Sequence, residues 1–227
     1  MPCCRAKGNS ELNFAGSWQR METDMCKKQM ILQRIVCYAV LIAAALVLVY
    51  SLGYMTDLYE NKLSYYAENY YRYDADPATL KVLGSEIYYD MQEFNRALTA
   101  AGIVLILLAA AQFVFQNHNR RKYYIANYIT VGVNTVATVY YSIWALSNIF
   151  TYKERYITTV DFETLKKMNE AFKFSYTEST FWFDASKVVF GIVLIACVLN
   201  VLNMVWKICL MNNEKKLVKA GKEGKAA

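Results

Sequence analysis

The stretch IVCYAVLIAAALVLVYSLGYMT, residues 35–56, runs for 22 residues without a charged side chain. Three further uncharged runs follow: 23 residues at 97–119, 30 at 123–152 and 19 at 188–206. An α-helix rises about 1.5 Å per residue, so roughly 20 residues cross a hydrocarbon core about 30 Å thick. A backbone in lipid must also satisfy its own hydrogen bonds, which makes each such run helical. The sequence therefore predicts an all-α integral membrane protein, a bundle of four transmembrane helices.

Basic residues are distributed unevenly between the segments that flank these runs. The two tails and the short loop after the second run together carry 15 basic and 5 acidic residues, whereas the other two loops carry 10 basic and 14 acidic residues. Lys and Arg near helix ends favour the cytoplasm. We therefore expect both termini to be cytoplasmic and the protein to reside in the plasma or cell membrane.

This topology divides the chain into nine segments. They are a cytoplasmic N-terminal tail (1–34), a first span (35–56), an extracytoplasmic helical hairpin (57–96), a second span (97–117), a cytoplasmic loop (118–122), a third span (123–150), an extracytoplasmic loop (151–187), a fourth span (188–208) and a basic cytoplasmic tail (209–227). We expect the last tail to be largely disordered.

Both external loops contain helical signals. In the first, apolar and aromatic residues recur every three or four positions, and Asp76 with Pro77 is a typical helix start. We therefore expect a helix from Pro77 that runs directly into the second span. In the second loop, Thr158 and Asp161 resemble a capping box ahead of a helical run from Phe162 to Phe172. These signals predict helical extensions outside the membrane.

An internal repeat relates the two halves of the chain. The segment YSLGYMTDLY at 50–59 aligns with YSIWALSNIF at 141–150, and GIVLI occurs at both 102–106 and 191–195. One match between apolar segments is expected by chance, but two matches in the same order favour a tandem repeat of two helical hairpins. Each hairpin would start on the same side of the membrane, so the repeats would be parallel.

The third span is the most polar of the four. Its asparagines lie at multiples of seven residues, which places them along one helix face, and the fourth span has a smaller polar patch. This face predicts either interhelical hydrogen bonds or a path for a polar solute. The residues of the polar intramembrane face are Asn127, Thr130, Asn134, Thr138, Asn148, Asn200 and Asn203.

Tyrosine is abundant, with 19 residues, and several crowd the first external loop. Aromatic side chains with a polar tip can pack a hairpin together or contact a protein partner. Tyr65, Tyr71 and Tyr89 fall off the expected packing stripe, so we take them as candidate partner-binding residues.

Motifs for nucleotide, metal, redox or acyl-transfer chemistry do not occur in the sequence. We therefore expect no cofactor, no metal, no catalytic residue of recognisable pattern and no nucleic-acid partner. The expected partners are the lipid bilayer and either a membrane or extracytoplasmic protein or another copy of the chain. The leading hypothesis is a non-enzymatic accessory or sensor-like subunit. A small-solute channel or transporter lined by the third span is second, and a membrane enzyme using Asp57, Asp74, Asp76 or Asp184 is third.

Overall fold

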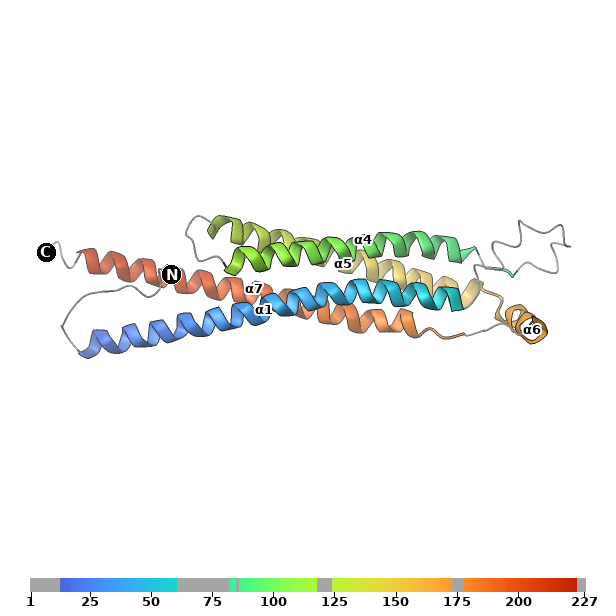
Figure 1. Cartoon of the computed structure of the whole chain (residues 1–227), viewed down its shortest axis with the longest axis horizontal. Helices are drawn as coiled ribbons and strands as arrows, with labels where there is room; N and C mark the ends of the chain where they lie inside the picture. Colours follow the sequence, from blue (N-terminus) through green and yellow to red (C-terminus); the bar gives the residue numbers. More distant parts are fainter. Residues whose placement is uncertain (1–12, 61–81, 85, 118–123, 173–177, 224–227) are drawn as a thin grey trace. The chain divides into compact units, whose positions relative to one another are not determined.

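The computed structural model describes residues 13–60, 82–84, 86–117, 124–172 and 178–223. Within these residues the chain is helical and has no strand; the helices are shown in Figure 1. They are α1 (Asn13–Glu60), α4 (Ile87–Asn117), α5 (Tyr124–Thr159), α6 (Phe162–Phe172) and α7 (Phe181–Glu223).

Four of these helices are long and apolar enough to cross a membrane. The qualifying segments are Lys27–Tyr54 in α1, Ile87–Gln116 in α4, Asn127–Thr159 in α5 and Phe181–Asn213 in α7. Each overlaps one of the uncharged runs. The prediction of an all-α chain is confirmed for the described residues, and four helices of the length and apolarity that a membrane span needs indicate an integral membrane protein.

Two expectations about helix ends are wrong. The basic tail is not disordered throughout, because α7 continues to Glu223. The helix expected from Pro77 into the second span is interrupted, because Gly84 adopts a left-handed conformation with φ +82° and α4 begins only at Ile87. A Cβ at Gly84 would overlap the Thr159 carbonyl, so the close approach of these two segments requires glycine. Asp76 and Pro77 lie outside the described residues.

The chain forms two compact units, and each of the long helices contributes to both. The first, here called the terminal unit, comprises residues 1–42, 107–137 and 195–227. The second, here called the aromatic unit, comprises residues 43–106 and 138–194.

The aromatic unit is packed around rings from all four long helices. The Tyr54 ring lies 5.5 Å from Phe183 and 6.3 Å from Phe94, edge-on to both. Phe94 in turn lies 5.1 Å from Trp144, and Tyr156 lies 5.4 Å from Phe183. Tilted and edge-to-face pairs at these separations are favourable beyond the area that they bury. Much of the aromatic content of the sequence therefore serves packing.

Small residues allow the backbones of this unit to approach closely. A Cβ at Gly102 of α4 would lie 3.1 Å from the Leu48 backbone nitrogen of α1. A Cβ at Gly53 would overlap the Trp182 ring of α7. Glycine is typical of helix contacts inside membranes, where the absence of a side chain permits tight van der Waals packing.

Candidate functional site

The terminal unit contains a cluster of buried carboxamide side chains. At its centre, Gln112 of α4 exchanges two hydrogen bonds with Asn200 of α7: its Nε2 donates to Asn200 Oδ1 at 2.6 Å, and its Oε1 accepts from Asn200 Nδ2 at 3.2 Å. Gln112 Oε1 also accepts from Asn134 Nδ2 of α5 at 2.7 Å. One glutamine therefore joins three helices.

A second group of polar contacts joins α1 to α4 and α7. Gln33 Nε2 donates to the Gln116 backbone carbonyl at 2.6 Å, and Cys37 Sγ donates to Gln116 Oε1 at 2.7 Å. Gln33 Oε1 accepts from Lys207 Nζ at 3.1 Å and from Gln29 Nε2 at 3.2 Å. Gln29 Nε2 also donates to Asn203 Oδ1 at 3.4 Å. Buried hydrogen bonds of this kind tie helices together and fix their rotation.

The residues of the predicted polar intramembrane face differ in their burial and in their hydrogen-bond partners. Asn127, Asn134 and Thr138 are buried in the bundle, whereas Thr130 and Asn148 are half-buried and bond to carbonyls of their own helix. Asn200 and Asn203 are both buried. Asn134 and Asn200 are brought together through Gln112.

Sequence reasoning missed the four glutamines of the cluster, Gln29, Gln33, Gln112 and Gln116. All four are buried. Their spacing was a usable signal, because both pairs are separated by four residues and so share a helix face. Gln112 and Gln116 also lie inside an uncharged run, where a polar side chain needs a partner.

Three buried polar atoms of the terminal unit have no hydrogen-bond partner within the described part of the chain. They are Asn127 Oδ1, Thr135 Oγ1 and Asn203 Nδ2. An unsatisfied buried polar atom costs about 1–3 kcal/mol, and such an atom calls for a specific explanation.

The other candidate site is the end of the aromatic unit that carries α6 (Figure 1). The Asp161 backbone amide donates to the Leu83 carbonyl at 3.0 Å, next to the Gly84 turn described above. On α6, Leu165 is buried and Phe162 lies 5.1 Å from the Tyr156 ring. Backbone and side-chain contacts therefore hold the short helix against the ends of α4 and α5.

Asp161 caps α6, and the predicted capping box is wrong in its detail. Asp161 Oδ1 accepts from the Thr164 backbone amide at 3.0 Å, and Asp161 Oδ2 accepts from the Thr164 hydroxyl at 2.7 Å. These hydrogen bonds stabilise the charged form and lower the pKa of the Asp161 carboxyl. Thr158 is not the cap, because it still belongs to α5 and donates to the Glu154 carbonyl.

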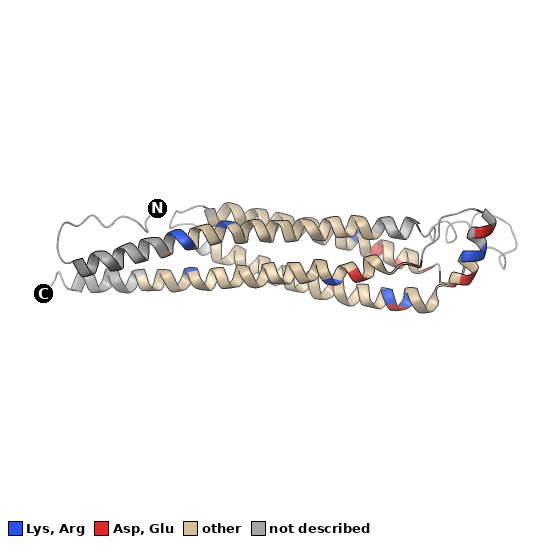
Figure 2. Ribbon diagram, turned by 90° about the horizontal axis from the view of Figure 1, so that it is seen from below, with Lys and Arg blue, Asp and Glu red and all other residues tan. Residues whose placement is uncertain are grey.

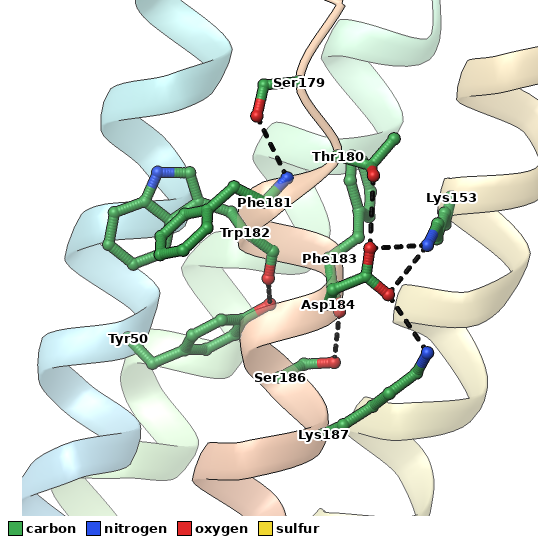
Figure 3. Close-up of polar contacts among 10 residues, drawn as sticks. All are labelled: Tyr50, Lys153, Ser179, Thr180, Phe181, Trp182, Phe183, Asp184, Ser186 and Lys187. Carbon is green, nitrogen blue, oxygen red and sulfur yellow. Dashed lines mark hydrogen bonds and ion pairs between the residues drawn. The ribbon is translucent and has the colours of Figure 1, made fainter.

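Two ion pairs of the aromatic unit join different helices. Lys153 of α5 and Lys187 of α7 both contact the Asp184 carboxylate, at 2.7 Å and 3.0 Å, and the Thr180 hydroxyl donates to it at 3.1 Å (Figure 3). Arg155 pairs with Asp90 at 2.9 Å. Asp184, one of the acids considered for an enzyme site, is thus engaged by two lysines. The side chains of Asp57, Asp74 and Asp76 lie outside the described part.

The candidate partner-binding tyrosines are only partly placed. Tyr89 is 42% exposed, and its ring packs edge-on against Tyr88. Tyr65 and Tyr71 lie outside the described residues. Four side chains of α6 are described as exposed, and all are charged: Glu163, Lys166, Lys167 and Glu170, coloured by charge in Figure 2.

Comparisons of this chain with protein-family models, with curated proteins and with solved structures found no match. Among the residues that the structure describes, no group of three or more His, Cys, Asp and Glu side chains is placed to hold a metal ion.

Proposed function

We propose that this chain is a non-enzymatic multi-pass membrane protein, an accessory or sensor-like subunit, that binds a protein partner through the α6 end of its aromatic unit. The observation that carries the proposal is the fixation of α6. Its N-terminus is capped by Asp161, the adjacent backbone is bonded to Leu83, and its apolar side is packed on Tyr156. A helix held in one place with its charged side exposed loses little conformational freedom on binding, which favours affinity.

The proposal includes the orientation of the chain, with both termini cytoplasmic and the α6 end outside. The charge distribution supports it. Described side chains of the terminal unit include four basic residues, Lys27, Lys28, Arg34 and Lys207, and no acidic one, whereas those of the aromatic unit carry both signs (Figure 2). An excess of Lys and Arg beside the spans is typical of the cytoplasmic side.

We also infer that the bundle arose from a tandem repeat of two hairpins. Some positions that the sequence repeat equates have equal burial, such as Ser51 with Ser142 and Tyr54 with Ala145, whereas Tyr50 is buried and Tyr141 is half-buried. The repeat is imperfect, because Gly102 contacts the α1 backbone whereas a Cβ at Gly191 would meet nothing within 4 Å. Divergence after duplication accounts for such a difference.

Partner binding is tested by isolating the full-length protein in nanodiscs and identifying co-purifying proteins by mass spectrometry. We expect a stoichiometric partner with the wild type, and its loss in a Lys166→Glu/Lys167→Glu variant and, to a smaller extent, in Tyr89→Ala. Lys28→Glu, which changes the charge of an exposed residue in the terminal unit, is the matched control. An identical set of co-purifying proteins for the wild type and the α6 variant would reject the proposal.

A second candidate, a small-solute channel or transporter, is favoured by the carboxamide cluster and its three unpartnered atoms. The test is Asn134→Leu. A solute path predicts that flux into proteoliposomes is lost while the melting temperature is kept. A lower melting temperature with unchanged flux means that Asn134 only joins helices, and it eliminates this candidate.

A further inference from the structure

The exposed face of α5 in the aromatic unit has the chemistry of a contact between helices and not that of a surface covered by lipid. We propose that this face is a dimer interface, at which α5 packs in parallel against α5 of a second copy of the chain. The face does not include α6, so self-association and the partner binding proposed above are independent. Its residues, all exposed, are Tyr140, Ile143, Ser147, Phe150, Glu154 and Ile157.

The spacing of these six residues suits a packed pair of helices. They follow one another at alternate intervals of three and four residues, which keeps a stripe of side chains facing a partner helix. One row of the stripe is polar (Tyr140, Ser147, Glu154), and the other is apolar (Ile143, Phe150, Ile157). The outward face of any helix in a left-handed bundle has similar spacing, so the decisive feature is the chemistry of the residues.

The composition of α5 does not match its exposure. Of the four candidate spans, α5 has the lowest mean hydropathy, and the rest of the chain also buries the smallest share of its most apolar stretch. A span that faces lipid on most sides should instead be the most apolar, because hydrocarbon offers polar side chains no partner. This mismatch points to a protein surface over part of α5.

Tyr140 is the strongest single indication. Its side chain is 64% exposed, and its ring packs edge-on against Tyr141 at 5.4 Å. Its hydroxyl has no hydrogen-bond partner among the residues that the structure describes. The uncharged run at 123–152 has 30 residues, of which about 20 cross the hydrocarbon. Every window of 20 residues within this run includes Tyr140.

No placement of the membrane along α5 gives the whole face a suitable environment in a single chain. Tyr140 lies 12 residues before the run ends, about 18 Å at a rise of about 1.5 Å per residue. A hydrocarbon layer that ends there therefore has the unpaired hydroxyl near its middle. A layer that ends just beyond Tyr140 leaves Ile143 and Phe150 in water instead. Ile157, which is 53% exposed, follows the charged residues 153–155 in either case.

The hydroxyls of the face are complementary to those of a second copy. Copies inserted in the same orientation place equal residues at equal depth, so a two-fold axis along the membrane normal sets Tyr140 opposite Tyr140 and Ser147 opposite Ser147. A hydroxyl is both a donor and an acceptor, so each of these pairs can form a hydrogen bond. Hydrogen bonds between spans are favourable in a membrane.

Charges at the outer end of the face are complementary as well. Lys187 Nζ lies 5.8 Å from the centre of the Phe150 ring, so this ammonium flanks the face. Lys187 and Lys153 share the Asp184 carboxylate, which leaves an excess positive charge (Figure 3). Glu154 follows Lys153 in the chain, and its carboxylate has no ion-pair partner in the described part. The two-fold axis brings Glu154 of each copy to the level of Lys187 of the other.

Cysteine cross-linking tests the register of this interface. The full-length protein, with its native cysteines replaced by serine, is reconstituted into liposomes at low protein density and oxidised with copper phenanthroline. We expect Ser147→Cys to form a disulfide-linked dimer and Ala100→Cys to remain monomeric. Ala100 is a matched control because it is exposed on α4 at a similar depth. Phe94, six residues before it, packs against Tyr152, five residues after Ser147.

The affinity of the dimer is measured without replacing the native cysteines, by counting the photobleaching steps of fluorescently tagged chains over a range of protein-to-lipid ratios. Tyr140→Phe removes only the hydroxyl, and we expect the affinity to fall at least about 3-fold with an unchanged melting temperature of the monomer. Glu154→Lys turns an attraction into a repulsion twice per dimer, and we expect a fall of at least about 5-fold. Glu93→Lys makes the same charge change at an exposed position of α4 and should change the affinity less than about 2-fold.

Several outcomes would overturn the proposal. The wild type would be monomeric at every density, or it would dimerise while Ser147→Cys failed to cross-link. Equal cross-linking of Ala100→Cys and Ser147→Cys would mean that the copies collide at random. In native membranes, linkage of Ser147→Cys to a different polypeptide, without any dimer, would assign the face to another protein.

Discussion

At the scale of single residues, Gln112 is the most consequential polar side chain of the terminal unit. Gln112→Leu would leave Asn134 and Asn200 without the amide that joins them inside an apolar bundle. Interhelical hydrogen bonds in membranes contribute about 0.6–1.7 kcal/mol each, so we expect a loss of about 1–3 kcal/mol in the free energy of unfolding. Reversible denaturation in micelles measures this change.

The matched control for Gln112→Leu is Asn148→Leu. Asn148 is also polar and within a span, but its Nδ2 bonds only to the Trp144 carbonyl of its own helix at 2.7 Å. We expect a loss of less than about 0.5 kcal/mol for this substitution, because no hydrogen bond to another helix within the described part of the chain is lost. Equal losses in the free energy of unfolding for the two variants would mean that any polar side chain within a span stabilises the protein, and that the contacts of Gln112 with two other helices have no additional effect.

Gly102 and Gly191 open the same pentapeptide, yet they should respond oppositely to alanine. A Cβ at Gly102 would press on the Leu48 backbone at 3.1–3.2 Å, and a backbone cannot move aside as a flexible side chain can. At Gly191 a Cβ meets nothing within 4 Å. We expect Gly102→Ala to lower the melting temperature and Gly191→Ala to leave it unchanged or raise it, because alanine is the better helix former. A decrease in melting temperature for Gly191→Ala would contradict the packing described for α7.

At the scale of elements, α6 should depend on pH through its cap. The pKa of Asp161 is lowered in the folded protein, so its stabilising contribution is complete above the unfolded value of about 3.9 and is lost as the pH falls through the folded value. Asp161→Ala should destabilise α6 by about 0.5–2 kcal/mol at pH 7. Hydrogen exchange of α6 amides, after correction for the intrinsic rate at each pH, measures the difference between variant and wild type.

The same measurement contains its own control. The difference between Asp161→Ala and the wild type should shrink as the pH falls below about 4, where the unfolded carboxyl becomes protonated, and should be lost once the pH passes the lowered pKa of Asp161 in the folded protein. Asp161→Asn retains an amide oxygen as a capping acceptor and should keep most of the protection at both pH values. A pH-independent difference would assign the effect to packing at the turn and not to the charge.

At the scale of the whole molecule, the apolar runs were sufficient to predict four membrane-spanning helices, because the bilayer leaves the backbone no alternative. The helix ends were less predictable. Gly84 interrupts a periodic pattern because the Thr159 carbonyl lies against it, and that contact joins segments far apart in the sequence. The α6 helix was predicted at its observed position, since its cap and its apolar spacing are local signals.

The carboxamide cluster shows what one-dimensional patterns miss. The asparagines of the third span could be identified from their seven-residue spacing, but the partner of Asn134 is Gln112, a glutamine on another helix. Gln33 accepts a hydrogen bond from Lys207, which is 174 residues away in the sequence, so its role in joining helices cannot be seen from its own segment. A pattern within one helix predicts a face, whereas the identity of what that face contacts depends on how the helices are arranged.

The orientation of the chain in the membrane decides on which side a partner of α6 would be found, and cysteine labelling tests it. In a variant whose native cysteines are replaced by serine, Lys167→Cys places a thiol on the exposed side of α6, and Asn213→Cys places one on an exposed position of α7 in the terminal unit. We expect a membrane-impermeant maleimide to label Lys167→Cys in intact cells, and to label Asn213→Cys only after permeabilisation. The reason is the excess of basic residues beside the terminal unit, which resists translocation.

The two possible failures have different consequences. Labelling of Asn213→Cys alone in intact cells would reverse the topology, so that α6 would meet a cytoplasmic partner. Labelling of both positions in intact cells would place the ends of α5 and α7 on the same side of the membrane, and the four-span arrangement itself would be wrong. The expected pattern would leave α6 available to an extracellular partner.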